Sequence, residues 1–268
     1  MTNIGFQPSG AADRRGSPRS GGSVASIGEE RALAPPRSGG SSRTAPLEAR
    51  LSSYAPLRPQ DVEVVRACHD DARSVAPGGE LLRADSAHGH PRLIVSGWAA
   101  VVRTLADGRR QILQILLPGD LPGLSTQIDT PVALTQVVTT DAAPLAVALA
   151  NDAPEHAALR LAWDRARAAR RKQVSDQIVR LGRLSAFERV ASVFVELMDR
   201  HRRAGLSDGR RIPWPLTQET LADVVGLSVV HVNRVLQQLR REGLIALRAG
   251  QLVVADPDKL TAVATCER

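Results

Sequence analysis

The sequence predicts an α+β protein with a β-rich N-terminal domain, a long connecting helix and a C-terminal winged helix-turn-helix. Three observations support this prediction. Short β-like runs broken by turn residues fill 72–150, a helix-favouring run covers 154–184, and two short helices with a hairpin are expected over 216–254. We accordingly expect four parts: a tail (1–46), a β-roll domain (47–153), the long helix (154–184) and a winged helix-turn-helix domain (185–268).

The tail, residues 1–46, is rich in Gly, Ser, Pro and Arg and has few large apolar residues. Such a composition buries too little apolar surface to offset the entropy of ordering, so we expect disorder. The tail also lacks the apolar middle of a secretory signal. No apolar run approaches the roughly 20 residues of a membrane span, so we expect a cytoplasmic protein without a membrane partner.

The basic charge of the chain is concentrated in its C-terminal half. Residues 1–153 hold 15 Lys/Arg and 15 Asp/Glu, whereas 154–248 hold 18 against 10 and carry the whole excess behind the net charge of +7. This distribution favours a polyanionic partner. A solvated basic face without a partner is the alternative that charge alone leaves open.

Two cysteines, Cys68 and Cys266, are too few for a disulfide framework or a four-cysteine iron–sulfur site. We expect reduced thiols, no metal and no cofactor. A haem or metal on a histidine is a minor alternative, with the candidates His69, His88, His90 and His156. Whether His88 or His90 has a ligand role stays open.

Regular short strands in the N-terminal domain favour a small antiparallel roll. Turn signals such as Asp107-Gly108 separate them, and a helical pattern over 47–69 precedes them. The expected strands are Leu93–Val95, Trp98–Val102, Gln111–Leu117 and Ala133–Thr140.

Apolar residues recur at three- and four-residue steps along the long helix, as in a coiled coil. The alternative is that this stripe packs on the chain's own roll. We favour a homodimer with a seam formed by Trp163, Val174, Ile178 and Leu181. Ser185 and Glu188 fit a capping box that starts a fresh helix to about Arg200, and 201–212 is expected to be a flexible connection.

The clearest local signals lie in the winged helix-turn-helix. Thr217 is expected to cap a first helix, Gly226 to form the turn, and Ser228 to cap a second helix over 229–241. On that second helix, Val232, Val235, Leu236 and Leu239 share one face and are predicted core. The residues expected to point outward are Val229, Val230, Asn233, Arg234 and Gln237. A hairpin is predicted from Leu244–Leu247 and Gln251–Val254.

Two helices joined by a tight turn can place the second helix in the major groove of double-stranded DNA. Arg234 matches the O6 and N7 acceptors of guanine, and Asn233 could reach adenine or a phosphate. Val229 and Val230 can meet only a thymine methyl or a sugar. Phosphate contacts are expected from Thr217, Gln218, Arg240, Arg241 and Arg248.

These residues also carry a family resemblance. The chain resembles the Crp/Fnr family of bacterial transcription regulators (the cyclic-AMP receptor protein and FNR) over about 47–254. In the C-terminal domain the matching motifs are Leu216–Asp223, Gly226–Ser228, His231–Leu236 and Leu239–Ile245. In the N-terminal domain they are Leu93–Val102, Asp107–Ile112 and Leu117–Leu121.

The resemblance implies a β-roll sensor of the cyclic-nucleotide-binding kind (a double-stranded β-helix) and a homodimer on a pseudo-palindromic DNA site. It places Arg234 at the family's base-reading arginine and His231 near a phosphate-contacting position, although His231 could equally pack on the backbone. Val229 and Val230 depart from the polar readers of better-known members, so the family's usual target sequence is not transferred.

The sensor also departs from cyclic-nucleotide-binding relatives. In Gly119–Ser125 a leucine stands where the ribose-binding Glu is expected, and Thr130–Ala133 offers no Arg for the cyclic phosphate. A buried phosphate without a cationic partner is strongly disfavoured. We expect neither cyclic AMP nor cyclic GMP to bind, and the effector stays open.

The sequence bears on three classes of function. The favoured one is a sequence-specific, DNA-binding transcription regulator, in which a loop of the roll could touch RNA polymerase. The alternative is an interaction module whose winged helix binds a protein partner through Val229 and Val230. An enzyme is not expected, because the chain has no phosphate-loop motif, nucleophile elbow or metal-spaced His/Cys cluster.

Overall fold

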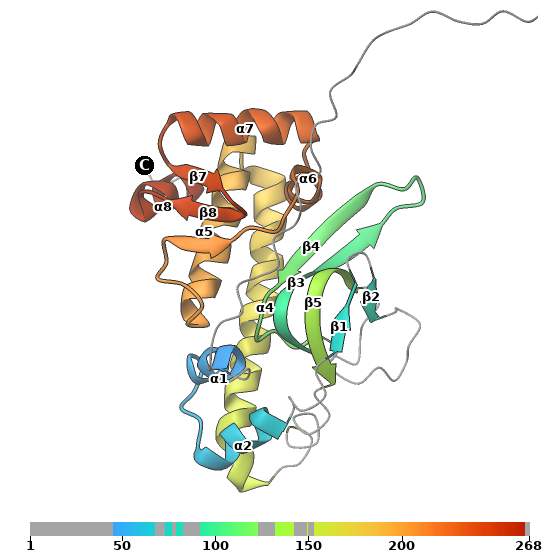
Figure 1. Ribbon diagram of the computed structural model, residues 1–268, viewed down its shortest axis with the longest axis vertical. Helices are drawn as coiled ribbons and strands as arrows, with labels where there is room; N and C mark the ends of the chain where they lie inside the picture. Colours follow the sequence, from blue (N-terminus) through green and yellow to red (C-terminus); the bar gives the residue numbers. More distant parts are fainter. Residues whose placement is uncertain are drawn as a thin grey trace, which may run out of the picture. The chain divides into compact units, whose positions relative to one another are not determined.

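The N-terminal domain is built on an antiparallel sheet, and the C-terminal half is mainly helical (Figure 1). The computed structural model describes residues 45–67, 73–76, 79–82, 92–122, 132–141, 149 and 153–265. The tail up to 44, the two cysteines and His69, His88 and His90 lie outside the described residues. So do 123–131, which include most of the segment where a cyclic nucleotide would be held.

The helical pattern predicted over 47–69 corresponds to two short helices that precede the sheet. They are α1 (Ala45–Ser52) and α2 (Pro59–Ala67). Leu47 and Leu51 on α1 and Val65 on α2 are buried in an apolar cluster with Leu159 on a later helix. The predicted helical character of this segment is confirmed.

The sheet has the strand order β1-β5-β3-β4, with β2 also paired to β5, and every described pair is antiparallel. Its strands are β1 (Arg73–Val75), β2 (Glu80–Leu82), β3 (Arg92–Thr104), β4 (Arg110–Leu116) and β5 (Val132–Asp141). The prediction of two separate runs at 93–95 and 98–102 is wrong, because both belong to β3. The register against β5 shifts on either side of Ser96 and Gly97, so the chain bulges there instead of turning.

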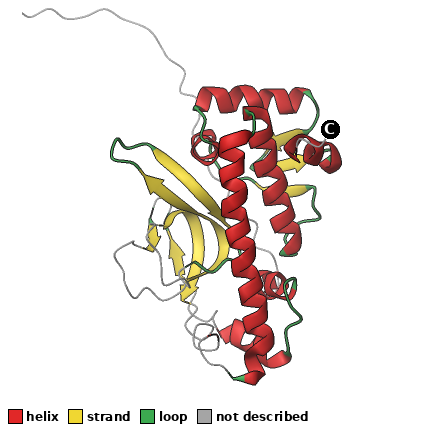
Figure 2. Ribbon diagram, turned by 180° about the vertical axis from the view of Figure 1, so that it is seen from behind, coloured by secondary structure: helices red, strands yellow, loops and turns green. Residues whose placement is uncertain are grey.

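The long helix α4 (Ala157–Arg183) follows a short 3₁₀ turn, η1 (Pro154–His156), and runs alongside the sheet (Figure 2). Of the four predicted seam residues, Val174 and Ile178 point outward and are 41% and 67% exposed. Trp163 instead packs on the α1–α2 cluster, and Leu181 lies against the glycine of the helix-turn-helix turn. A seam made of all four residues is untested and stays a prediction.

Helix α5 (Ala186–Arg203) begins at the capping box that the sequence predicted. The Ser185 hydroxyl accepts the Glu188 N–H, and the Glu188 carboxylate accepts the Ser185 N–H at 2.7 Å. The helix runs three residues beyond Arg200, and β6 (Arg211–Pro213) joins the wing, so the connection predicted over 201–212 is shorter than expected. A last helix, α8 (Pro257–Thr265), was not predicted, and it buries Leu260 and Ala264 in the same core as α5.

Aromatic residues from both halves of the chain meet in this core. Trp98 on β3 lies 5.3 Å from the His201 ring on α5 and 6.0 Å from Trp214, measured between ring centroids. Trp214 contacts Phe194 edge-on at 5.0 Å. The sheet and the helices that follow it therefore share one apolar core.

A buried carboxylate also joins the two halves. Asp120, in the turn after β4, pairs with Arg50 on α1 and with Arg200 on α5, both at 2.8 Å. Burial alone would raise the pKa of the Asp120 carboxyl, but the two guanidiniums and the Leu117 N–H outweigh it and hold that pKa below its ordinary value. At neutral pH the Asp120 carboxylate is therefore ionised and paired with both arginines.

His201 provides a pH-dependent test of this core. Burial lowers its pKa to about 4, although Nδ1 donates to the Leu197 carbonyl at 2.8 Å. The unfolded chain therefore binds a proton between pH 6.5 and 4 that the folded chain does not, so stability falls as pH falls. We expect a loss of up to about 3 kcal/mol across this range, measured by urea unfolding.

The control is His201→Gln, which keeps a donor for Leu197 and should lose this dependence. Asp120 contributes little to this pH dependence, because its lowered pKa affects stability mainly as the pH falls through its ordinary value of 3.8. A wild-type slope that persists in His201→Gln would show that another group is responsible.

Candidate nucleic-acid interface

The helix-turn-helix forms as its caps predict. Helix α6 (Gln218–Val225) starts at Thr217, whose hydroxyl accepts the Thr220 N–H at 3.0 Å. Gly226 ends it in the left-handed region at φ 64°. Helix α7 (Val229–Arg241) starts at Ser228, whose hydroxyl accepts the His231 N–H at 3.3 Å. These local predictions are confirmed.

The wing is a three-stranded sheet, and two of its strands follow α7. Strands β7 (Ile245–Arg248) and β8 (Gln251–Val254) confirm the predicted hairpin, with the first strand shifted by one residue. Ala249 and Gly250 both adopt positive φ in its two-residue turn. The third strand, β6, pairs with β8 and was not foreseen, because three residues containing a proline give little strand signal.

Helix α7 has one buried and one exposed face. Val232, Val235, Leu236 and Leu239 are buried as predicted. On the other face Val229 and Val230 are 42% and 63% exposed, and Arg234 is also exposed. Asn233 is half-buried and thus less available than Val229, Val230 and Arg234. The exposed N-terminal half of the helix therefore presents two apolar side chains, one guanidinium and the His231 imidazole.

The arginines around this face are not neutralised. Helix α7 contains neither Asp nor Glu. Within the part of the chain that the structure describes, Arg234, Arg240, Arg241 and Arg248 form no ion pair. By contrast, Arg180 and Arg200 inside the protein both contact Glu196. These four unpaired arginines lie exposed on α7 and the wing, where they suit a polyanion.

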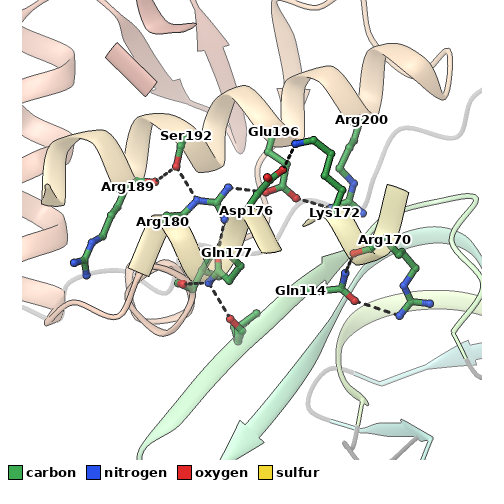
Figure 3. A network of polar contacts seen from close by, with 12 residues as sticks. Gln114, Arg170, Lys172, Asp176, Gln177, Arg180, Arg189, Ser192, Glu196 and Arg200 are labelled. Carbon is green, nitrogen blue, oxygen red and sulfur yellow. Dashed lines mark hydrogen bonds and ion pairs between the residues drawn. The ribbon is translucent and has the colours of Figure 1, made fainter. Parts of the chain in front are cut away.

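Some polar residues near this interface were not identified from the sequence. Gln177 and Arg180 lie buried on the inward face of α4 and contact each other, and Arg180 continues to Ser192 and Glu196 on α5 (Figure 3). On β4, Arg110 pairs with Asp223 of α6 at 2.8 Å. The only sequence signal for these contacts is that Gln177, a polar residue, occupies a core position of α4. Its partners, the carbonyls of Val224 and Ile112, lie 47 and 65 residues away along the chain.

The sensor turn is occupied by internal contacts. The Asp120 carboxylate forms ion pairs with Arg50 and Arg200, and Leu121 is buried in the α1–α2 cluster. Among the described residues, no group of three or more His, Cys, Asp or Glu could hold a metal ion. In the same part of the chain, none of the helices has the length and apolarity that a membrane crossing requires.

Comparison with known proteins agrees with both domains. Residues 188–263 match the model of the Crp-like helix-turn-helix domain, and residues 72–150 match that of the cyclic nucleotide-binding domain. Together these matches span the sensor sheet and the winged helix-turn-helix.

Regulators of known role are similar along most of their length. The nitrogen fixation regulation protein FixK of Rhizobium meliloti is 28% identical over 217 residues, which cover 78% of this chain and 98% of that protein. FixK of Bradyrhizobium diazoefficiens is 30% identical over 173 residues, which cover 64% of this chain and 72% of that protein. The structure of FixK2 from Bradyrhizobium japonicum aligns with a TM-score of 0.60 at 27% identity, over 72% of this chain and 96% of that one.

The sensor sheet, the long helix and the winged helix-turn-helix define a DNA-binding transcription regulator with a cyclic-nucleotide-binding-type domain. The chain belongs to the Crp/Fnr family. Members of this family are transcription regulators that bind DNA and act as dimers. The alternative of a winged helix that binds a protein partner is not favoured.

Two glycines test how tightly the helix-turn-helix turn is packed. Both Gly226 and Gly243 have positive φ, but a Cβ on Gly226 would lie 3.1 Å from Leu181 Cδ2, whereas one on Gly243 would meet nothing within 4 Å. We expect Gly243→Ala to cost about 1 kcal/mol of unfolding free energy from backbone strain alone. Gly226→Ala should cost more, because Leu181 on α4 must also move.

Thermal and urea unfolding of the two variants provide the measurement. Equal losses would mean that the contact between α4 and the turn does not constrain the helix-turn-helix.

Proposed function

We propose that the chain acts as a homodimer that reads a pseudo-palindromic operator, with one α7 helix per subunit in the major groove. Half-sites about one helical turn apart follow from the twofold symmetry. The observation that carries the proposal is the exposed face at the start of α7, where Arg234 has no carboxylate partner among the described residues. A protein that binds operators on chromosomal DNA would act in the cytoplasm.

Four side chains are proposed to face the bases. Arg234 would donate to guanine O6 and N7, and Asn233 would contact adenine or a phosphate. Val229 and Val230 would pack against thymine methyl groups, which their exposure supports. A site read by one guanidinium and two valines should combine a guanine with neighbouring thymines.

A second set of residues is proposed to position the helix on the phosphates without reading sequence. All of its members are exposed: Thr217, Gln218, His231, Arg240, Arg241 and Arg248. The Thr217 hydroxyl already accepts a backbone N–H, yet a hydroxyl can still donate to a phosphate. Binding should weaken steeply with salt, because each phosphate contact releases counterions.

The proposed dimer seam centres on Val174 and Ile178, which α4 presents away from its own domain. Trp163 and Leu181 would contribute only at the edges, since both already pack within the subunit. A helix that exposes apolar side chains in an aqueous subunit gains free energy when a second copy covers them.

The proposed signal is something other than cyclic AMP. One similar protein, from Mycobacterium tuberculosis, is named a cAMP-activated regulator, at 29% identity. In this chain Asp120 and Leu121 are committed to internal contacts, which supports a different effector or partner. We propose no enzymatic activity. A contact with RNA polymerase is part of the proposal, but no residue is assigned to it.

The base-reading role is tested on an operator selected from genomic fragments bound by the protein. Arg234→Ala should cost about 1–3 kcal/mol of binding free energy on this operator and much less on random duplex of equal length. Added cyclic AMP should leave both affinities unchanged. Fluorescence anisotropy measures each affinity.

Two variants serve as controls for this experiment. Arg241→Ala should weaken binding to both duplexes and lower the salt slope by about one, as expected of a phosphate contact. Arg202→Ala, whose guanidinium pairs with Asp199 on α5, should change neither. An equal loss for Arg234→Ala on both duplexes would remove its base-reading role.

The seam is tested by Ile178→Asp. Because Ile178 is 67% exposed in one subunit, the change should leave the fold of that subunit intact. In a dimer it would bury an unpaired carboxylate, at a cost of several kcal/mol, so we expect monomers by light scattering and weak operator binding.

Leu206→Asp is the matched control, since Leu206 is an exposed apolar residue in the loop after α5. It should remain dimeric. A dimer that survives Ile178→Asp would place the seam elsewhere.

A further inference from the structure

The end of α6 leaves three backbone carbonyls without partners inside the helix-turn-helix. Gly226 begins the turn, so the last carbonyls of the helix cannot continue the helical pattern. The Ala222 carbonyl accepts the N–H groups of Gly226 and Leu227. The carbonyls of Asp223, Val224 and Val225 remain.

Each of these carbonyls accepts a hydrogen bond from another element. Gln111 on β4 donates its side-chain amide to Asp223 O at 2.7 Å and to Val224 O at 3.1 Å. Gln177 on α4 donates to Val224 O at 2.7 Å. Arg189 on α5 reaches the third carbonyl, on Val225, at 3.4 Å. We call Gln111 and Gln177 the amide clasp.

The orientation of the Gln177 amide is determined by its neighbours (Figure 3). Its Oε1 accepts a hydrogen bond from Arg180, which is held in turn by Ser192 Oγ at 2.7 Å and Glu196 at 2.8 Å. The Gln177 NH₂ group must therefore face the carbonyl oxygens. Because Gln177 and Arg180 are only 5% and 6% exposed, water cannot easily replace these contacts.

The clasp acts at the point that determines where α7 begins. Only Gly226, Leu227 and Ser228 separate α6 from α7, and the proposed readers Val229 and Val230 follow at once. A support from β4 and α4 at the end of α6 therefore also orients the first turn of α7. Arg110 on β4 reinforces it from the side by pairing with Asp223 at 2.8 Å.

We infer that Gln111 and Gln177 are positioning residues for DNA reading. They hold the helix-turn-helix in a defined orientation relative to the sensor sheet and the proposed dimer helix, so that both reading helices of a dimer meet their half-sites together. This inference rests on the reading role proposed for α7.

The inference predicts more than a loss of stability. Each buried hydrogen bond is worth about 1 kcal/mol, which is enough to lower the population of the reading orientation about fivefold. Operator binding needs both reading helices in register, whereas random duplex is bound through phosphates in many registers. Loss of the clasp should therefore reduce the specific affinity selectively.

The experiment uses the full chain with Gln111→Met or Gln177→Met, which keep the side-chain length and remove the donor. We expect about five- to tenfold weaker binding to the selected operator and less than about twofold change on random duplex. Gln173→Met, one helical turn earlier on α4, is the matched control and should change neither affinity. Gln111→Lys keeps a donor at a helix C-terminus and should retain operator binding.

Three results would overturn the inference. An equal loss on both duplexes, or a loss of thermal stability alone, would mean that the clasp is only structural. Tighter operator binding would mean that it holds α7 away from DNA. Because Gln111 is only half-buried, its variants decide the question even if Gln177→Met does not fold.

Arg234→Ala is measured in the same series. If Arg234→Ala loses specificity while the glutamine variants do not, this inference alone fails. If Arg234→Ala keeps specificity, the proposed reading helix fails independently of the clasp.

Discussion

The two helices of the helix-turn-helix, α6 and α7, depend on hydrogen-bond donors that lie outside them. The last carbonyls of α6 have no partner within the motif, and a buried carbonyl left unsatisfied costs about 1–3 kcal/mol. Gln111, Gln177 and Arg189 supply the donors from β4, α4 and α5. Because the carbonyls at the end of α6 need these donors, the motif is linked to the sensor sheet and to the long helix.

Arginines serve two separate purposes in this chain. Those inside pair with carboxylates: Arg50 and Arg200 with Asp120, and Arg180 with Glu196. Buried pairs of this kind contribute little net stability but penalise any arrangement that separates them, so they specify how elements meet. The arginines of α7 and the wing carry no such partner within the described residues, which leaves their charge available to phosphates.

The sensor shares its fold with cyclic-nucleotide-binding domains, but its turn after β4 is used differently. Asp120 connects α1 to α5, and Leu121 completes the apolar cluster beneath α1 and α2. The indole rings of Trp98 and Trp214 then continue the contact between the sheet and the winged domain. A perturbation of this turn would reach α5 directly, since one carboxylate serves both sides.

The sequence by itself determined the features that depend on residues three or four positions apart. The caps at Ser185, Thr217 and Ser228, the turn at Gly226 and the core face of α7 were all predicted, because their partners are local. Only the tertiary structure decided which side chains of α4 pack within the subunit. It also decided that 93–102 belongs to one strand with a bulge. It also decided that Gln111 meets Asp223, because that contact spans 112 residues and no local pattern records it.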